Sequence, residues 1–444
     1  MNKSRLIAAG AALSVVCSAS AAAQQRPPIR QLGAVTAKTT EVFGNVASVR
    51  ALSNGSLLVN DVPGRRVLMF DPQLSTFTVI ADSTSATANA YGGRTGSLIA
   101  YRGDSTLFVD PQSVSMLVID PAGKVARVVA IPRAEDASSI GGLGGAMYDG
   151  RGGIVYRPFN FGFRAGGGGA VRIQAAAPSG SATPGGIHLP EPPDSAFIVR
   201  VDLASRKLDT VGVVKIPKVK FETRTDDNGR FSMSSLLNPL PVVDEWVVTP
   251  DGAIAFVRGR DYHVDWVNPD GSKVASAKIP FNWQRLTDED KVAFIDSVKA
   301  ARERAGNSPL ALGALGGGGA PQQNISIQIG PGGPGGGPGR GNPDRAPTAA
   351  QVNFIPANEL PDYKPPFFAG SVKADTEGNI WVRTIPTEAV SGGPVYDVIN
   401  RKGELVERVQ IPVGRMIVGF GPGGAVYLAN RDGTTLTLER ASVR

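Results

Sequence analysis

The chain has 444 residues, of which 42% are hydrophobic, so it holds enough apolar material for a folded core. Its 46 basic and 39 acidic residues give a formal net charge of +7, which is mild for this length and does not indicate a nucleic-acid-binding protein. The 55 glycines and 34 prolines supply too many turns for a helical bundle. This composition favours an all-β protein with many chain reversals.

The first 23 residues have the features of a secretory signal peptide. Lys3 and Arg5 precede an apolar run over 6–16, and residues 21–23 are alanines that fit the small-residue cleavage rule. We therefore expect residues 1–23 to be removed and the protein to be exported, either to the periplasm or to the medium. The alternative is a lipoprotein anchored through Cys17, the single cysteine. No later stretch approaches a transmembrane segment, which takes about 20 apolar residues.

A pattern of four short strands recurs along the rest of the chain. In its clearest copy, over 48–81, the first turn is Asn54-Gly55, a strong hairpin signal. The other copies cover residues 97–131, 146–202 with an interruption, 245–279, 370–411 and, with only three strands, 416–439. The segment 34–43 has the composition of the missing strand.

These repeats predict a six-bladed β-propeller of four-stranded antiparallel blades, closed by the N-terminal strand 34–43. Residues 24–444 would then form a single domain. Seven blades and a pair of β-sandwich domains are the alternatives. In a propeller, four-stranded sheets repeat around an axis, so the grouping in fours favours it.

The pattern Asp/Asn-Gly-x-Ile/Leu-aromatic-Val, followed by a strand that ends in Asp, resembles six-bladed propellers of the NHL and gluconolactonase-like (TolB-like) superfamily. The stretch 59–72 is the most similar. The resemblance implies the fold, and it implies a divalent cation in the central channel, for which Asn60, Asp61 and Asp110 offer oxygen ligands suited to Ca²⁺. The Glu-Gly-Pro segment that supplies the family's first ligand is absent from this chain.

Three long insertions interrupt the repeats, at 158–195, 219–244 and 281–369, and the strand order predicts that all of them emerge on one face. The longest contains a predicted helix from Asp288 to about 305, capped by Thr287, with Val292, Ile295 and Val298 on one side. The Gly/Pro-rich tract 313–347 is predicted to be mostly disordered.

The ends of the second strands should point toward the channel mouth on the insertion-rich face. They place Asn60, Asp61 and Asp110 on one side and Arg157, Arg258, Arg383 and Asn430 on the other. Arginines there could clamp a carboxylate, phosphate or sulfate. The alternative is that these arginines pair with the aspartates of neighbouring blades.

The sequence thus predicts an exported binding module, a monomer, that takes a protein partner or a small anionic ligand on its insertion-rich face. The competing prediction is a Ca²⁺-dependent hydrolase, lactonase or lyase of the gluconolactonase-like kind. With only His188 and His263, the chain cannot build a His-rich metal site. Any hydrolytic triad would also need one of these two as its base.

Overall fold

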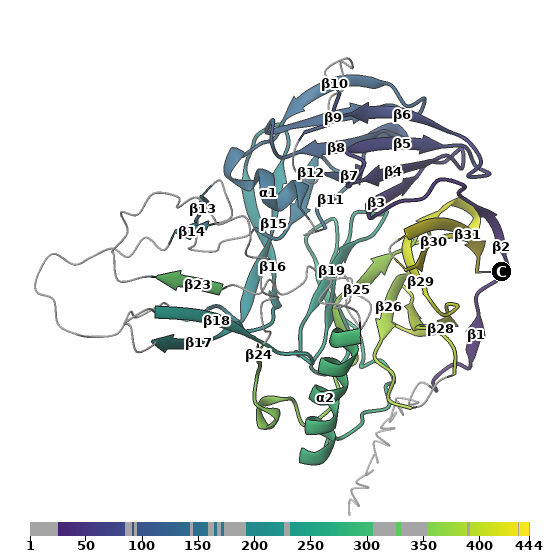
Figure 1. The fold of residues 1–444 in the computed structure, drawn as a ribbon. Coiled ribbons are helices and arrows are strands. Elements are labelled where there is room, and N and C mark those ends of the chain that lie inside the picture. The colour runs from purple at the N-terminus through teal and green to yellow at the C-terminus, as the bar shows by residue number, and fades with distance from the viewer. Residues whose placement is uncertain are drawn as a thin grey trace, which may run out of the picture.

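The computed structural model describes residues 25–84, 91–92, 96–142, 145–158, 164–166, 170–172, 192–225, 231–304, 326–329, 353–388, 391–433 and 435–443. Within these ranges the protein is all-β and consists mainly of four-stranded antiparallel sheets, an arrangement consistent with a β-propeller (Figure 1). The expected signal peptide lies outside the described residues. No helix in the described ranges is both long enough and apolar enough to cross a membrane.

Three sheets are meanders in which consecutive strands pair. Sheet 1 contains β3 (Val46–Ala51), β4 (Leu57–Asp61), β5 (Arg66–Phe70) and β6 (Phe77–Asp82). Sheet 2 contains β7 (Ser97–Ala100), β8 (Thr106–Asp110), β9 (Ser115–Ile119) and β10 (Val125–Ala130). Sheet 4 contains β19 (Glu245–Val248), β20 (Ile254–Arg258), β21 (His263–Val267) and β22 (Lys273–Ala275). They coincide with the first, second and fourth repeats of the sequence.

The other three sheets recruit strands from distant parts of the chain. Sheet 3 contains β11 (Met147–Tyr148), β12 (Gly153–Tyr156), β15 (Ser195–Asp202) and β16 (Leu208–Lys215). Sheet 5 contains β25 (Phe367–Ala374), β26 (Ile380–Thr384), β27 (Val395–Ile399), β28 (Leu405–Gln410) and, parallel to β28, β1 (Ile29–Gln31). Sheet 6 contains β29 (Arg415–Gly421), β30 (Ala425–Asp432), β31 (Thr435–Ser442) and β2 (Val35–Lys38).

The N-terminal segment therefore pairs with the C-terminal part of the chain twice. Val35 lies opposite Ala441 in antiparallel pairing, and Phe43 forms a further bridge with Leu436, so the expected pairing of 34–43 with the last repeat is confirmed. The parallel strand β1 on sheet 5 was not predicted. Its three residues carry no alternating apolar pattern, and parallel pairing to a remote strand leaves no local signal.

Six hydrophobic clusters lie between consecutive sheets. One cluster joins sheets 1 and 2, and the next ones join 2 and 3, 3 and 4, 4 and 5, 5 and 6, and 6 and 1. Side chains along one strand alternate between two clusters: Leu57 and Val59 point toward sheet 6, whereas Leu58 points toward sheet 2. This explains why the inner strands are apolar on both faces. The first strands of successive sheets also contact one another, from β29 through β3, β7, β11 and β19 to β25.

The recurrent Gly turns close the hairpins as the sequence predicts. Gly55, Gly252 and Gly271 have φ of 86°, 83° and 86°, in the left-handed region where glycine is favoured. Each of these glycines donates its N–H to the carbonyl oxygen three residues earlier. A residue with a Cβ would strain these turns, which is why the Asp/Asn-Gly signal marks them reliably.

The insertions contain structure of their own. The first carries the hairpin β13 (Arg164–Gly166) and β14 (Ala170–Arg172). The second carries β17 (Lys220–Thr225) and β18 (Phe231–Leu237), and the third carries α2 (Asp288–Arg304), β23 (Ser326–Ile329) and β24 (Asn353–Phe354). In Figure 1 the β13–β14 hairpin and strands β17, β18 and β23 project to the same side of the molecule.

The short helices are α1 (Ala137–Gly141), η1 (Arg102–Asp104), η2 (Ala134–Asp136), η3 (Ala357–Glu359) and η4 (Pro422–Gly424).

The second and third insertions form one unit. Strand β18 pairs with β17 and, from the third insertion, with β23 and β24. A seventh hydrophobic cluster fastens both insertions to sheet 5 through Ile385; its other buried members are Leu240, Leu286, Ile295, Ile355 and Leu360. The sequence did not predict this joint unit, because its strands are separated by the whole of sheet 4.

One expectation about the third insertion needs correction, and another is tested only in part. Helix α2 begins as expected: the Thr287 hydroxyl accepts the Asp290 N–H, and the Asp290 carboxylate accepts the Thr287 N–H. However, Val292 is 51% exposed, and Lys291 lies on the buried side with Ile295 and Val298. In the tract 313–347, which we expected to be mostly disordered, residues 326–329 form β23 because they complete the sheet of β18. The rest of that tract lies outside the described residues.

Candidate functional site

Asn60, at the end of β4, is fully buried and joins sheet 1 to sheet 2. Its side-chain nitrogen donates to the Gly96 carbonyl at 2.7 Å, and its side-chain oxygen accepts from the Tyr91 hydroxyl at 2.9 Å. Burial raises the pKa of Tyr91, and the charges of Asp61 and Asp110 raise it further. The structure thus gathers the three expected metal ligands around Tyr91.

These three residues do not fit a calcium site, because their polar atoms are committed to the protein. Asp61 accepts from the Arg66 guanidinium at 2.8 Å, and Arg66 also pairs with Glu41. Asp110 caps its own turn by accepting from the Gln112 N–H and the Ser113 hydroxyl. In the described part of the chain, no group of three His, Cys, Asp or Glu side chains is placed to hold a metal.

Arg258 and Asn430 likewise have internal partners. Arg258 donates to Asp265 at 2.8 Å, to Asp244 at 2.9 Å and to the Val213 carbonyl at 2.8 Å. Asn430 donates to Glu439 at 2.9 Å, and Glu439 also pairs with Arg415. Arg258 and Asp61 thus form Asp–Arg pairs within their own repeats, not between neighbouring blades as the alternative had it. Neither Arg258 nor Asn430 is available to clamp an anion.

His263 is also a structural residue. Its two ring nitrogens lie 2.8 Å from Asp261 and 3.1 Å from Asp265, and Asp265 is the carboxylate that Arg258 holds. A catalytic base needs one nitrogen facing a nucleophile. With a carboxylate on each side, His263 cannot serve in a hydrolytic triad. His188 lies outside the described residues.

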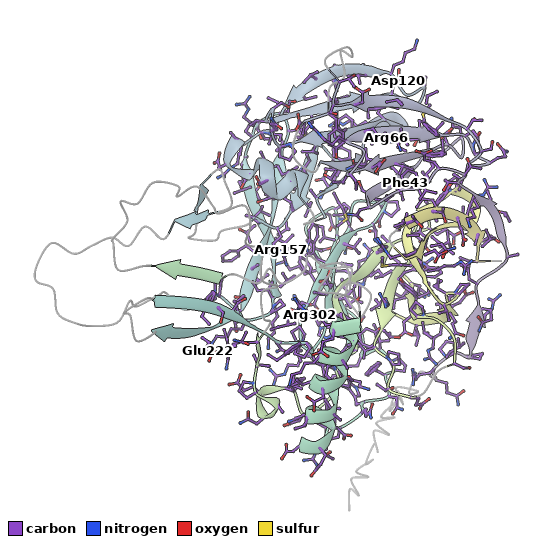
Figure 2. All side chains as sticks on the ribbon, viewed as in Figure 1. Phe43, Arg66, Asp120, Arg157, Glu222 and Arg302 are labelled. Carbon is purple, nitrogen blue, oxygen red and sulfur yellow. The ribbon has the colours of Figure 1, made fainter. Side chains whose placement is uncertain are left out.

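Two arginines of the predicted set remain, Arg157 and Arg383. Arg157 follows β12, and Figure 2 shows it near the middle of the molecule; its charge acts on Glu245 of sheet 4. Arg383 is half-buried near the end of β26, and it makes no hydrogen bond or ion pair with any residue the structure describes. Arg383 lies directly opposite Tyr396 in the sheet. Burial raises the pKa of Tyr396, and the positive charge of Arg383 offsets part of that rise.

Lys373, which the sequence analysis missed, is a second half-buried cation on the same face of sheet 5. Lys373 lies opposite Trp381, and Arg383 is two residues beyond Trp381, so the two cations are diagonal neighbours about 7–8 Å apart at the backbone. The side chain of Lys373 makes no hydrogen bond or ion pair with any of the described residues. Burial lowers its pKa, although the nearby charge of Glu245 opposes that shift.

Glu245, also missed, lies near Lys373. It is the first residue of β19, and its carboxylate accepts the N–H of Gly370 in β25 at 2.8 Å. Part of its surface is accessible, yet the surrounding protein desolvates the carboxylate enough to raise its pKa to about 7, with Asp244 contributing. The charges of Arg157 and Lys373 oppose that rise. The sequence did contain a signal for Glu245 and Lys373. Both are charged residues on the first strand of a sheet, and the other residues of such a strand contribute to apolar clusters on both faces.

Four charged residues on sheets 4 and 5 and at the end of β12 form what we call the axial cluster: Arg157, Glu245, Lys373 and Arg383. Glu245 interacts with Arg157 and Lys373, and Arg383 joins the set through its place beside Lys373 on the face of sheet 5 that carries Trp381 and Tyr396. It contains two cations without an ion-pair partner and one carboxylate poised to titrate near neutral pH. The hydroxyl of Ser371, two residues from Lys373, is buried without a hydrogen-bond partner among the described residues. Such an arrangement is suited to recognising a small anion.

Of the comparisons with known proteins, only the one with solved structures finds matches. No family model matches the sequence, and no curated protein matches it. A streptogramin B lyase has 10% identity and a TM-score of 0.36, covering 91% of this chain and 96% of its own. Regucalcin, a calcium-binding protein from Agrobacterium tumefaciens, has 11% identity and a TM-score of 0.38, covering 94% and 98%. A putative gluconolactonase has 10% identity and a TM-score of 0.35, covering 94% and 95%.

The three structures are a lyase, a calcium-binding protein and a putative gluconolactonase. We transfer no ligand or activity from them, since their identities are 11% or less and their TM-scores 0.38 or less. What the protein does is therefore argued from its own residues.

Proposed function

We propose that the chain is an exported, six-bladed β-propeller whose ring is closed by β2 and that it serves as a binding module. The six hydrophobic clusters support the ring, because each sheet packs on the next and the last packs on the first. A monomer fits a closed ring, because radial repetition leaves only short, protected sheet edges for a second copy.

The ligand that we propose is a small anion, bound at the axial cluster by Lys373 and Arg383. The observation that carries this proposal is that both cations lie half-buried on one face of sheet 5 without an ion pair among the described residues, the charge of Glu245 acting on Lys373 only from nearby. Burying an unpaired charge is costly, by several kcal/mol for a fully enclosed ion. A carboxylate, phosphate or sulfate group would offset that cost and would accept charge-assisted hydrogen bonds from both side chains.

Titration calorimetry with sulfate and succinate tests the proposal at constant ionic strength. We expect binding by the unmodified protein and at least a tenfold loss of affinity in Lys373→Met and in Arg383→Gln, since each removes a charge-assisted contact. Lys207→Met is the matched control, because Lys207 is 72% exposed and pairs only with Asp209 at the surface. Equal affinity in Lys373→Met and the unmodified protein would refute the site.

The competing function, a Ca²⁺-dependent hydrolase, receives less support from the residues. Its expected ligands Asn60, Asp61 and Asp110 are used for contacts within the protein. A rise in the melting temperature with Ca²⁺ that disappears in the Asp61→Ala/Asp110→Ala double variant would favour this function.

Export is tested separately, by N-terminal sequencing of the protein recovered from the periplasm or medium, which should begin at Gln24.

The insertions offer a second mode of binding, to a protein partner. The joint unit of β17, β18, β23, β24 and α2 is fastened to sheet 5 at Ile385, just beyond Arg383. A partner seated on this unit would thus lie close to the axial cluster. Deletion of residues 219–242 should abolish capture of such a partner while leaving sulfate binding in place.

A further inference from the structure

Glu245 lies near Lys373, so its charge can affect whether an anion binds to the Lys373 ammonium group. Its carboxylate is held on β25 by the 2.8 Å hydrogen bond from the Gly370 N–H, three residues before Lys373. This bond fixes a negative charge next to the cations that would receive the ligand. A fixed carboxylate there has two opposite effects, since it balances Lys373 without a ligand and repels an arriving anion.

The charges around Glu245 come from three elements. Arg157 approaches from sheet 3, Lys373 lies on β25, and Asp244 is the preceding residue of its own chain segment. Asp244 is committed elsewhere: it pairs with Arg258 and accepts the backbone N–H groups of Lys215 and Gly259. Glu245 is therefore the group in this set whose charge can be given up without breaking an ion pair in the described structure.

Protonation of Glu245 leaves its anchoring contact intact. A neutral carboxyl group can still accept the Gly370 N–H through its carbonyl oxygen, and its proton becomes a new donor. The anion would then meet Lys373 and Arg383 without the negative charge of Glu245 beside them. Consistent with this, desolvation already raises the pKa of Glu245 to about 7, so that the proton costs little at neutral pH.

We infer that anion binding at the axial cluster is proton-linked, with Glu245 taking up one proton as the anion binds beside Lys373. This inference rests on the proposed anion site and adds its regulation by pH. Affinity should be highest under mildly acidic conditions and should fall as the medium becomes alkaline. In an exported protein, the surrounding pH would then set how much ligand is held.

Sulfate is the probe of choice, because its charge does not change between pH 6 and 8. Calorimetry in Bis-Tris and Tris buffers, which are cationic and do not compete for the site, gives the dissociation constant at pH 6, 7 and 8. For a carboxyl group with a pKa of about 7, we expect the dissociation constant to rise about tenfold from pH 6 to pH 8. Buffers of different ionisation enthalpy should report uptake of up to about one proton at pH 8.

The Glu245→Gln variant keeps the shape of the side chain and an oxygen acceptor for Gly370. We expect it to bind sulfate equally well at pH 6 and pH 8, with the affinity of the unmodified protein at pH 6. Glu377→Gln is the control, because Glu377 lies exposed in the turn between β25 and β26. It should keep the tenfold dependence.

The outcomes separate this inference from the proposed function. If sulfate binds, and Lys373→Met abolishes binding, but Glu245→Gln retains the tenfold dependence on pH, the proton linkage is wrong and the anion site stands. If sulfate does not bind at any pH, the anion site itself is wrong. Proton uptake measured on the unmodified protein keeps the test valid even if the Gln variant does not fold, and zero uptake at pH 8 would refute the linkage.

Discussion

The hydroxyl of Tyr262 donates a 3.0 Å hydrogen bond to the carboxylate of Asp397, across the interface between sheets 4 and 5. Both side chains are buried, at 0% and 1% exposed. Burial raises the pKa of Asp397 to about 6, although Tyr262, Arg408 and Arg26 all oppose the rise. The folded protein therefore disfavours the charged form of Asp397, even though Tyr262 and the two arginines stabilise it.

This relationship predicts a loss of stability as pH rises. The folded-state pKa of about 6 lies above the ordinary value of 3.8, so the folded protein binds the Asp397 proton more tightly than the unfolded chain does. The resulting stabilisation is complete below pH 3.8 and disappears as pH rises through 6. The shift corresponds to about 3 kcal/mol. Urea unfolding should show that the free energy of unfolding declines from pH 4 to pH 7, and that this decline is smaller in the Asp397→Asn variant.

Tyr262→Phe tests the hydrogen bond itself. At pH 7 it leaves a buried carboxylate with one donor fewer, which should cost about 1–3 kcal/mol. At pH 4, where Asp397 is protonated, the cost should be smaller. An equal loss of stability at both pH values would mean that the hydroxyl serves packing rather than the carboxylate.

A second prediction concerns the contact between sheets 6 and 1. Phe43 is 1% exposed, lies 6.2 Å from the Phe70 ring in an edge-on arrangement, and exchanges two backbone hydrogen bonds of 2.8 Å with Leu436 (Figure 2). Phe43→Ala should reduce the free energy of unfolding by about 3–5 kcal/mol, because it opens a cavity where the two sheets meet. Val42→Ala, at a side chain that is 49% exposed, should change it by less than about 0.5 kcal/mol. Similar melting temperatures for both variants would contradict the role of this segment in joining the sheets.

The sheets were predictable from the sequence and the axial cluster was not, for a physical reason. Strands such as β4 and β20 are apolar on both faces and follow the turns at Gly55 and Gly252, and these are local signals. The partner of a charged side chain depends on the three-dimensional arrangement. Arg258 and Arg383 occupy equivalent places in their repeats, yet Asp244 and Asp265 pair with the first, while the second has no such partner among the described residues.

The same limit applies to the expected metal ligands. Asn60, Asp61 and Asp110 do lie near one another, as the repeat predicts. Their hydrogen-bond partners are Tyr91 and Ser113, which lie outside the strands, and Arg66, the first residue of β5, and the repeat pattern specifies none of these contacts. Spacing along the chain could place the oxygen atoms but could not show that they were already satisfied.

A third prediction separates binding from stability at Lys373. Since this half-buried ammonium has no ion-pair partner among the described residues and burial lowers its pKa, the side chain costs stability in the absence of ligand. Lys373→Met should therefore raise the free energy of unfolding by about 1–2 kcal/mol while removing anion binding, a trade-off typical of functional sites. Chemical denaturation without added anion checks the first effect. A loss of stability in this variant would indicate that Lys373 has a structural partner instead.

The fourth prediction concerns which side of α2 packs on the joint insertion unit. Ile295 is 6% exposed within the cluster that contains Leu240 and Ile385, whereas Val292, only one turn away, is 51% exposed. Ile295→Ala should loosen this unit, increasing amide hydrogen exchange in α2 and in 235–240 by at least tenfold, because removal of a buried Ile costs about 2–5 kcal/mol. Val292→Ala should leave exchange unchanged. Since the six intersheet clusters do not include Ile295, exchange in β4 and β20 should be unaffected by either variant, and protection lost there would mean that the insertions and the sheets unfold together.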